Sequence, residues 1–216
     1  SGDFTMDSAK EFVGRLNAGA LPVPITLIGQ QSIGASLGEE SLDRSLTAGL
    51  YGFLAVAIFM LVWYRVPGLM AVCALLLYIA MVLVIFKLIP VTLTVAGIAG
   101  LILSVGMAVD ANILIFERMK EELQQGKMLE DAIREGFGRA WTSIRDSNVS
   151  SLITTAILYW FGVSVVRGFA LTLAIGILVS MFSAISVTRT LLLAAHTMGM
   201  KNRISLFLSG FARVKA

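Results

Sequence analysis

The chain has 216 residues, of which 57% are hydrophobic and only 14% are charged, and its mean hydropathy is +0.85. Soluble domains carry about 25% charged residues, so this composition excludes an ordinary soluble protein and indicates that lipid surrounds much of the chain. The single Cys73 excludes an intrachain disulfide, and with His196 as the sole histidine we expect no metal site and no bound cofactor.

The first 45 residues are the only part with the composition of a soluble protein. Residues 7–19, DSAKEFVGRLNAG, begin with Asp and Ser, end with Gly and predict a short helix. Residues 23–34, VPITLIGQQSIG, are rich in β-branched residues and predict a strand. One helix and one strand cannot bury a core, so we expect residues 1–45 to be a small α/β remnant at the end of a larger extracytoplasmic domain.

Five apolar runs follow, and each is close to the ~20 residues that a helix needs to cross ~30 Å of hydrocarbon. Only helices satisfy their own backbone groups in lipid without closing a barrel. We therefore predict an all-α membrane protein with a transmembrane domain over residues 46–195 and a cytoplasmic tail over residues 196–216. The predicted transmembrane helices cover residues 46–64, 66–88, 91–116, 147–166 and 168–195.

The basic residues are distributed unequally between the two sides of this predicted bundle. Twelve of the 17 lysines and arginines fall on the side that holds residue 65, the loop 117–146 and the tail. Cytoplasmic loops carry such an excess, so we expect an external N-terminal segment and a cytoplasmic C-terminus. The loop 117–146 has apolar residues at helical spacing and predicts an amphipathic helix, lying along the inner membrane surface or docked under the bundle. Its mixed charges favour general interfacial anchoring over a specific lipid site.

Small residues recur every four positions in two of the predicted spans. Gly100 and Ser104 belong to such a ridge in the third span, and Gly176 belongs to one in the fifth. These ridges allow close approach of helix backbones in lipid, so we predict helix packing there. In the fourth span Ser151 and Thr155 share a polar face, which could serve a neighbouring helix or line a wet crevice.

Asp110 is the only acidic residue well inside a predicted span. An aspartate at a helix centre costs ~2.5–3.5 kcal/mol on insertion scales, and intramembrane acids are functional by default. Gly106 lies one turn before it and Asn112 two positions after it, and both are candidate supporting residues. We predict a proton relay at Asp110, and the alternative is a structural hydrogen bond to Ser or Thr of the fourth or fifth span. No basic residue of the chain is deep enough to pair with it, since Arg189 lies toward the cytoplasmic end of its span.

Three blocks of the sequence resemble the SecD members of the SecD/SecF family, within the resistance-nodulation-division superfamily. The block GLILSVGMAVDANILIFERMKEEL, residues 100–123, is similar to the family signature around a functional aspartate. The block that starts AWTSIRDSNVSSLITTAILYW, from residue 140, is similar to the second membrane block. The segment 18–42 resembles the join between the extracytoplasmic domain and the second membrane helix. The resemblance covers essentially the whole chain.

The resemblance implies half of a twelve-helix bundle in the bacterial cytoplasmic (inner) membrane, with the last piece of the extracytoplasmic domain and helices two to six present here. It implies SecF, the SecYEG channel with SecA, and YajC as partners, preprotein as substrate, and membrane lipid but no nucleic acid as further contacts. Asp110 falls on the family's relay aspartate, with H⁺ as coupling ion and no catalytic residue. Asp146 and Asn148 match the D-x-N of the second block, where Asp146 is a plausible N-cap of the fourth span.

Three other functions compete with this one. An intramembrane aspartyl protease needs two acids in one site, and the second acid here, Asp146, is expected at a helix end. Another proton-coupled exporter of the same superfamily would share the fold, but the whole-chain likeness favours SecD. The third alternative is a passive bundle that only scaffolds partners.

Overall fold

The computed structural model describes residues 5–17, 35–197 and 207, and the chain divides into two units, Ser1–Ala35 and Ser36–Ala216. In the first unit, helix α1 spans Met6–Asn17, close to the helix predicted over residues 7–19. The Thr5 hydroxyl accepts a hydrogen bond of 3.4 Å from the Ser8 amide and begins this helix. The strand predicted over residues 23–34 lies outside the described residues.

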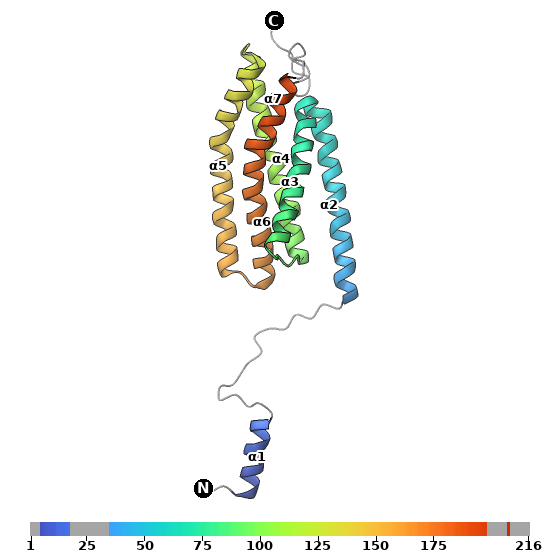
Figure 1. The fold of residues 1–216 in the computed structure, drawn as a ribbon, viewed down its shortest axis with the longest axis vertical. Helices are drawn as coiled ribbons and strands as arrows, with labels where there is room; N and C mark the ends of the chain where they lie inside the picture. Colours follow the sequence, from blue (N-terminus) through green and yellow to red (C-terminus); the bar gives the residue numbers. More distant parts are fainter. Residues whose placement is uncertain (1–4, 18–34, 198–206, 208–216) are drawn as a thin grey trace. The chain divides into compact units, whose positions relative to one another are not determined.

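The second unit is an antiparallel helical bundle (Figure 1). Its elements are α2 Ala35–Tyr64, α3 Val66–Leu88, α4 Val95–Gln124, α5 Leu129–Phe161, α6 Ser164–Phe182, the π-helix η1 Ser183–Thr188 and α7 Arg189–Thr197. Four stretches are long and apolar enough to cross a membrane: Glu40–Tyr64, Val66–Leu88, Val95–Gln124 and the continuous run Ser164–Ala195. Every element among the described residues is helical, which confirms the all-α membrane class.

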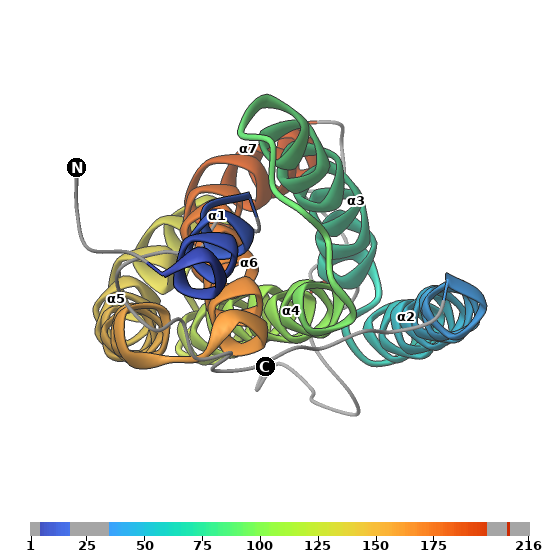
Figure 2. The ribbon, with the colours of Figure 1, turned by 90° about the horizontal axis from the view of Figure 1, so that it is seen from below.

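The turns alternate between the two ends of the bundle. The turn at Arg65, the α4–α5 turn and the end of α7 lie at one end, and the α3–α4 and α5–α6 turns lie at the other (Figure 1). The first of these ends holds most of the described basic side chains that are predicted to be cytoplasmic, among them Arg65, Arg118 and Lys127. Helices α4, α5 and α6 pack closely against one another, whereas α2 stands at the edge of the bundle (Figure 2).

The core runs along the seams between α3, α4, α5 and α6. Tyr78 of α3, Phe116 of α4, Ile133 of α5 and Ile177 of α6 are fully buried. Many other large apolar side chains point outward, among them those of α2, where Leu46, Leu50 and Ile58 are exposed. Outward apolar side chains are expected of a protein whose solvent is lipid.

The region 117–146 is the clearest departure from the prediction. It is neither a surface helix nor a separate segment under the bundle, because α4 continues to Gln124 and α5 runs unbroken from Leu129 to Phe161. No proline interrupts α5, and its apolar face packs along the end of α4. The residues of that face are Leu129, Ala132, Ile133, Phe137, Ala140 and Ile144.

The predicted fourth span over residues 147–166 is therefore the second half of α5. Helix α5 ends at Phe161 and α6 begins at Ser164, so the turn lies inside that predicted run and the last helix begins before residue 168. Asp146 lies in the middle of α5, so its predicted N-cap role is wrong. Helix α5 is not one of the four apolar candidates, because its serines, threonines and charges lower its hydropathy.

Candidate functional site: a polar crevice beside Asp110

Asp110 lines a crevice of about 220 Å³ between α4 and α5. The residues from α4 are Met107, Asp110, Ala111 and Leu114, and those from α5 are Ile144, Ser147, Asn148 and Ser151. The side chain of Asp110 is exposed in this chain, and no described residue gives it a hydrogen bond or an ion pair. The predicted structural bond to a Ser or Thr is therefore absent from the described part of the chain.

The α5 wall of the crevice consists of polar groups that bond to their own helix. The hydroxyls of Ser147 and Ser151 donate to the carbonyls of Ile144 and Ser147, at 3.2 and 3.0 Å. The Asn148 amide nitrogen donates to the Ile144 carbonyl at 2.8 Å. Each group thus uses a hydrogen on the backbone and keeps oxygen lone pairs. This wall can accept a hydrogen bond from water or from a protonated carboxyl group.

Neither Asn112 nor Gly106, the two residues predicted to support Asp110, lines the crevice. Asn112 is buried on the opposite side of α4, where its side-chain oxygen accepts a 2.8 Å hydrogen bond from the Thr188 hydroxyl of η1. Gly106 is exposed, and a Cβ added there would meet no atom within 4 Å. The structure therefore leaves the side of α4 at Gly106 open and directs Asn112 into the bundle.

Of the other candidate residues on α5, Asn148 lines the crevice, whereas Thr155 and Asp146 do not. Thr155 is buried and donates to the Leu152 carbonyl at 2.9 Å without lining the crevice. Asp146 is exposed and pairs with Arg145 at 2.9 Å, while Asn148 of the same motif lines the crevice. Asp146 therefore does not join Asp110 in the two-acid site that an aspartyl protease requires.

The three residues predicted to pack helices lie on one seam between α4 and α6. A Cβ at Gly100 would lie 2.7 Å from the Phe169 carbonyl oxygen, and a Cβ at Gly176 would overlap the Ser104 side chain. The Ser104 hydroxyl also lies 2.7 Å from the Tyr78 hydroxyl of α3. Tyr78 was not predictable from the sequence, because a lone tyrosine in an apolar run has no signal that separates a buried hydroxyl from an interfacial one.

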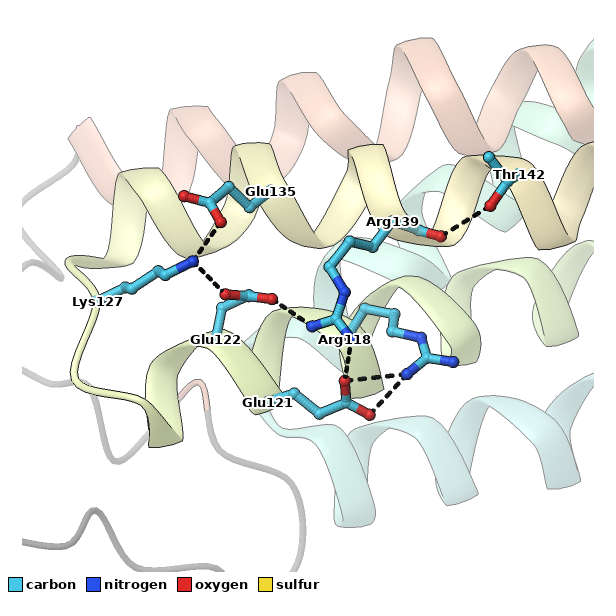
Figure 3. Close-up of polar contacts among 7 residues, drawn as sticks. All are labelled: Arg118, Glu121, Glu122, Lys127, Glu135, Arg139 and Thr142. Carbon is cyan, nitrogen blue, oxygen red and sulfur yellow. Dashed lines mark hydrogen bonds and ion pairs between the residues drawn. The ribbon is translucent and has the colours of Figure 1, made fainter.

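Charged side chains join α4 to α5 at the basic end of the bundle (Figure 3). This α4–α5 ion cluster consists of Arg118, Glu121, Glu122, Lys127, Glu135 and Arg139. The Glu122 side chain is only 3% exposed, and its carboxylate pairs with Arg139 and, at 2.6 Å, with Lys127. Hydrogen bonds to Glu122 and then to Glu135 raise the pKa of Lys127. The pairs inside α4 follow from its sequence spacing, but those that cross to α5 depend on the unpredicted antiparallel extension of both helices.

Comparison with known proteins identifies the family of this chain. Residues 19–198 match the model of the family described as protein export membrane protein SecD/SecF, C-terminal. The chain belongs to the SecD/SecF family. Its likeness to SecD therefore extends over both the Asp110 helix and the α5 wall of the crevice.

Individual relatives agree with this family assignment. The chain is 58% identical over 192 residues to a protein translocase subunit SecD of Thermobaculum terrenum, covering 87% of this chain and 37% of that protein. It is 52% identical over 193 residues to a protein translocase subunit SecD of Synechocystis, covering 89% and 41%. The chain thus spans about two-fifths of the length of these relatives. Both are translocase subunits, which are transport components rather than enzymes.

The fold is also similar to a solved structure. A crystal structure of SecDF, a translocon-associated membrane protein from Thermus thermophilus, matches with a TM-score of 0.82 and 36% identity. That match covers 100% of this chain and 29% of the SecDF chain. A second SecDF structure, in a super-membrane-facing form, matches with a TM-score of 0.73 and 39% identity over 90% of this chain.

Proposed function

We propose that this chain is the C-terminal membrane part of a SecD subunit that works with SecF to promote preprotein export, driven by the proton motive force. In this proposal the pair acts on the SecYEG channel downstream of SecA, with YajC as a further partner, in the bacterial inner membrane. The family match over residues 19–198 and the likeness to a translocon-associated SecDF support it.

The observation that supports a coupling role is the location of Asp110 and the lack of a partner for it among the described residues. Its side chain lines a polar crevice between α4 and α5 and has no hydrogen-bond or ion-pair partner among the described residues. An acid in this setting is a functional group by default. Asp110 is then half of a proton site, and we assign the missing cationic or acidic partner to SecF. A group that takes up a proton from one side and releases it to the other draws on ~2.3 kcal/mol per 100 mV for a full charge crossing.

Helix α5 supplies the fifth span of the proposed half-bundle. It has 33 residues and packs along α4 and α6, so its polar half faces helices and the crevice as well as lipid. The basic ends of α4 and α5 then face the cytoplasm and the N-terminal unit faces outward. Helix α1 exposes Phe12, Val13 and Leu16, as expected of a fragment of a larger extracytoplasmic domain.

A chimera tests this function. The chain would replace the corresponding membrane part of SecD in a bacterial host that is depleted of its own SecD. We expect the chimera to restore export of a secreted reporter when SecF is present and to have no effect when SecF is deleted. Stable, membrane-inserted chimera that leaves export at the depleted level in the presence of SecF would contradict the proposal.

A further inference from the structure

A second pocket lies toward the basic end of the bundle, and Ile144 is the one lining residue that it shares with the crevice at Asp110. Its volume is about 350 Å³, and α4, α5, η1 and α7 form its walls. Arg134 and Trp141 of α5 and Arg189 of α7 line it together with apolar side chains, including Ile115 and Ile185. Two arginines from different helices thus line one pocket together with apolar side chains, and the proposed proton site uses neither of them.

Among the described residues, only one of the two arginines of this pocket has a carboxylate partner. Arg189 has no ion pair with any described residue. Arg134 pairs with Glu130 at 2.9 Å, but its side chain is 57% exposed, so this bond is weak and exchangeable. The planar guanidinium group matches the geometry of phosphate oxygens and is less strongly hydrated than an ammonium group. The pocket is therefore complementary to a phosphate that carries an apolar tail.

The position of the pocket relative to the hydrocarbon boundary indicates which kind of molecule supplies that phosphate. Hydrocarbon is crossed by about 20 helical residues. Counting from Phe161 along α5 and from Ser164 along α6, the inner boundary falls near Trp141 and Ser183. Arg134 and Arg189 then lie ~9–11 Å beyond that boundary, at about 1.5 Å per residue. Tryptophan at the boundary and arginine beyond it are the residues that anchor a protein at the lipid headgroups.

We propose that this pocket binds one anionic phospholipid of the inner leaflet. Arg189 and Arg134 contact the headgroup phosphate, and the acyl chains lie against Trp141, Ile115 and Ile185. This assignment goes beyond the export function and does not depend on it. It also sharpens the expectation from the mixed charge of residues 117–146, which favoured only general interfacial anchoring.

Quenching of tryptophan fluorescence tests the site. The chain has three tryptophans, so the W63F/W160F variant reports on Trp141 alone. The whole 216-residue chain is reconstituted into phosphatidylcholine vesicles that contain a minor fraction of acyl-brominated phosphatidylglycerol or acyl-brominated phosphatidylcholine. We expect the fraction of brominated lipid that gives half-maximal quenching to be at least roughly fivefold lower for phosphatidylglycerol than for phosphatidylcholine. Each basic residue near the surface favours an anionic lipid by about that factor. Arg189→Gln should remove most of this preference, and Arg189→Lys should keep part of it.

Controls separate the site from general attraction. Arg145→Gln removes an exposed arginine of the same helix that does not line the pocket, and it should leave the preference unchanged. Circular dichroism establishes that each variant retains its helices. Equal quenching by the two lipids, no quenching by either, or a preference that survives Arg189→Gln would overturn the proposal. Loss of the preference on adding glycerol phosphate to the aqueous phase would assign the pocket to a soluble phosphate and would also overturn it.

Discussion

The Thr188 hydroxyl donates a 2.8 Å hydrogen bond to the side-chain oxygen of Asn112, two residues along α4 from Asp110. Both side chains are buried, at 0% and 4% exposure. Thr188 is the last residue of the π-helix η1, after which the chain returns to α geometry, and such π-bulges are frequent at functional sites. This bond therefore ties α4, the helix that carries Asp110, to the irregular part of the last span.

The bond between Thr188 and Asn112 should contribute measurably to stability. Thr188→Val keeps the shape but leaves the Asn112 oxygen without its donor, and we expect a loss of ~1–2 kcal/mol in the free energy of unfolding. Thr188→Ser should retain most of the stability. Thr190→Val changes an exposed threonine that bonds to its own helix, and it serves as the matched control. Unfolding of the purified chain in detergent measures all three, and equal midpoints for the two valine variants would contradict this assignment.

Close packing of α4 on α6 predicts a contrast between two glycines. A Cβ at Gly176 overlaps Ser104, so Gly176→Ala should cost ~1–3 kcal/mol through displacement of the helices. A Cβ at Gly106 meets nothing within 4 Å, so Gly106→Ala should be neutral or stabilise by up to ~1 kcal/mol through helix propensity. The same unfolding measurement compares them. A destabilised Gly106→Ala chain beside an unchanged Gly176→Ala chain would show that this seam is wrongly placed.

The α4–α5 ion cluster should depend on its buried carboxylate. Glu122→Gln leaves Lys127 and Arg139 facing each other without the charge between them, and we expect a loss of ~1–3 kcal/mol. Glu40→Gln removes an exposed partner of Arg44 one helical turn away, and we expect a change below ~0.5 kcal/mol. If both variants unfold alike, the cluster does not hold the two helices together.

The same cluster predicts a loss of stability at alkaline pH. The neighbouring carboxylates of Glu122 and Glu135 raise the pKa of Lys127 above its ordinary 10.5, so its stabilising effect is complete below that pH. The effect disappears as pH rises through the raised value, because Lys127 loses its proton. Unfolding midpoints of the native chain and of Lys127→Met should therefore converge above about pH 10.5. A difference that stays constant across that range would contradict the role of the charge.

The sequence predicted the helices whose boundaries carry a local signal. Arg65 and Pro67 separate α2 from α3, and the apolar run over residues 66–88 coincides with α3. The long α4–α5 hairpin was not predictable from hydropathy, since charged residues at 117–127 are equally typical of a loop. Those charges are held in helix by pairs three residues apart, such as Arg118 with Glu121, and by contacts that cross between the helices.

The candidate site was predictable in its centre and not in its surroundings. A lone acid in an apolar run identifies Asp110, and the serines of α5 are visible as a polar face. The sequence does not reveal that Asn112 points away from Asp110 toward Thr188, because helical neighbours two positions apart face different partners and the partner lies 76 residues away. The pairing of Tyr78 with Ser104 has the same cause, a contact that exists only after packing.

The most direct test of the account is the effect of Asp110→Asn on the stimulation of export by a proton gradient. Inverted membrane vesicles carrying the chimeric SecD with SecF would import a preprotein with and without a proton gradient, with Asp146→Asn as the matched control. We expect Asp110→Asn to assemble normally and to reduce gradient-stimulated import to the level without a gradient, while Asp146→Asn keeps the stimulation. Full stimulation in an assembled Asp110→Asn complex would contradict the relay role of this carboxyl group.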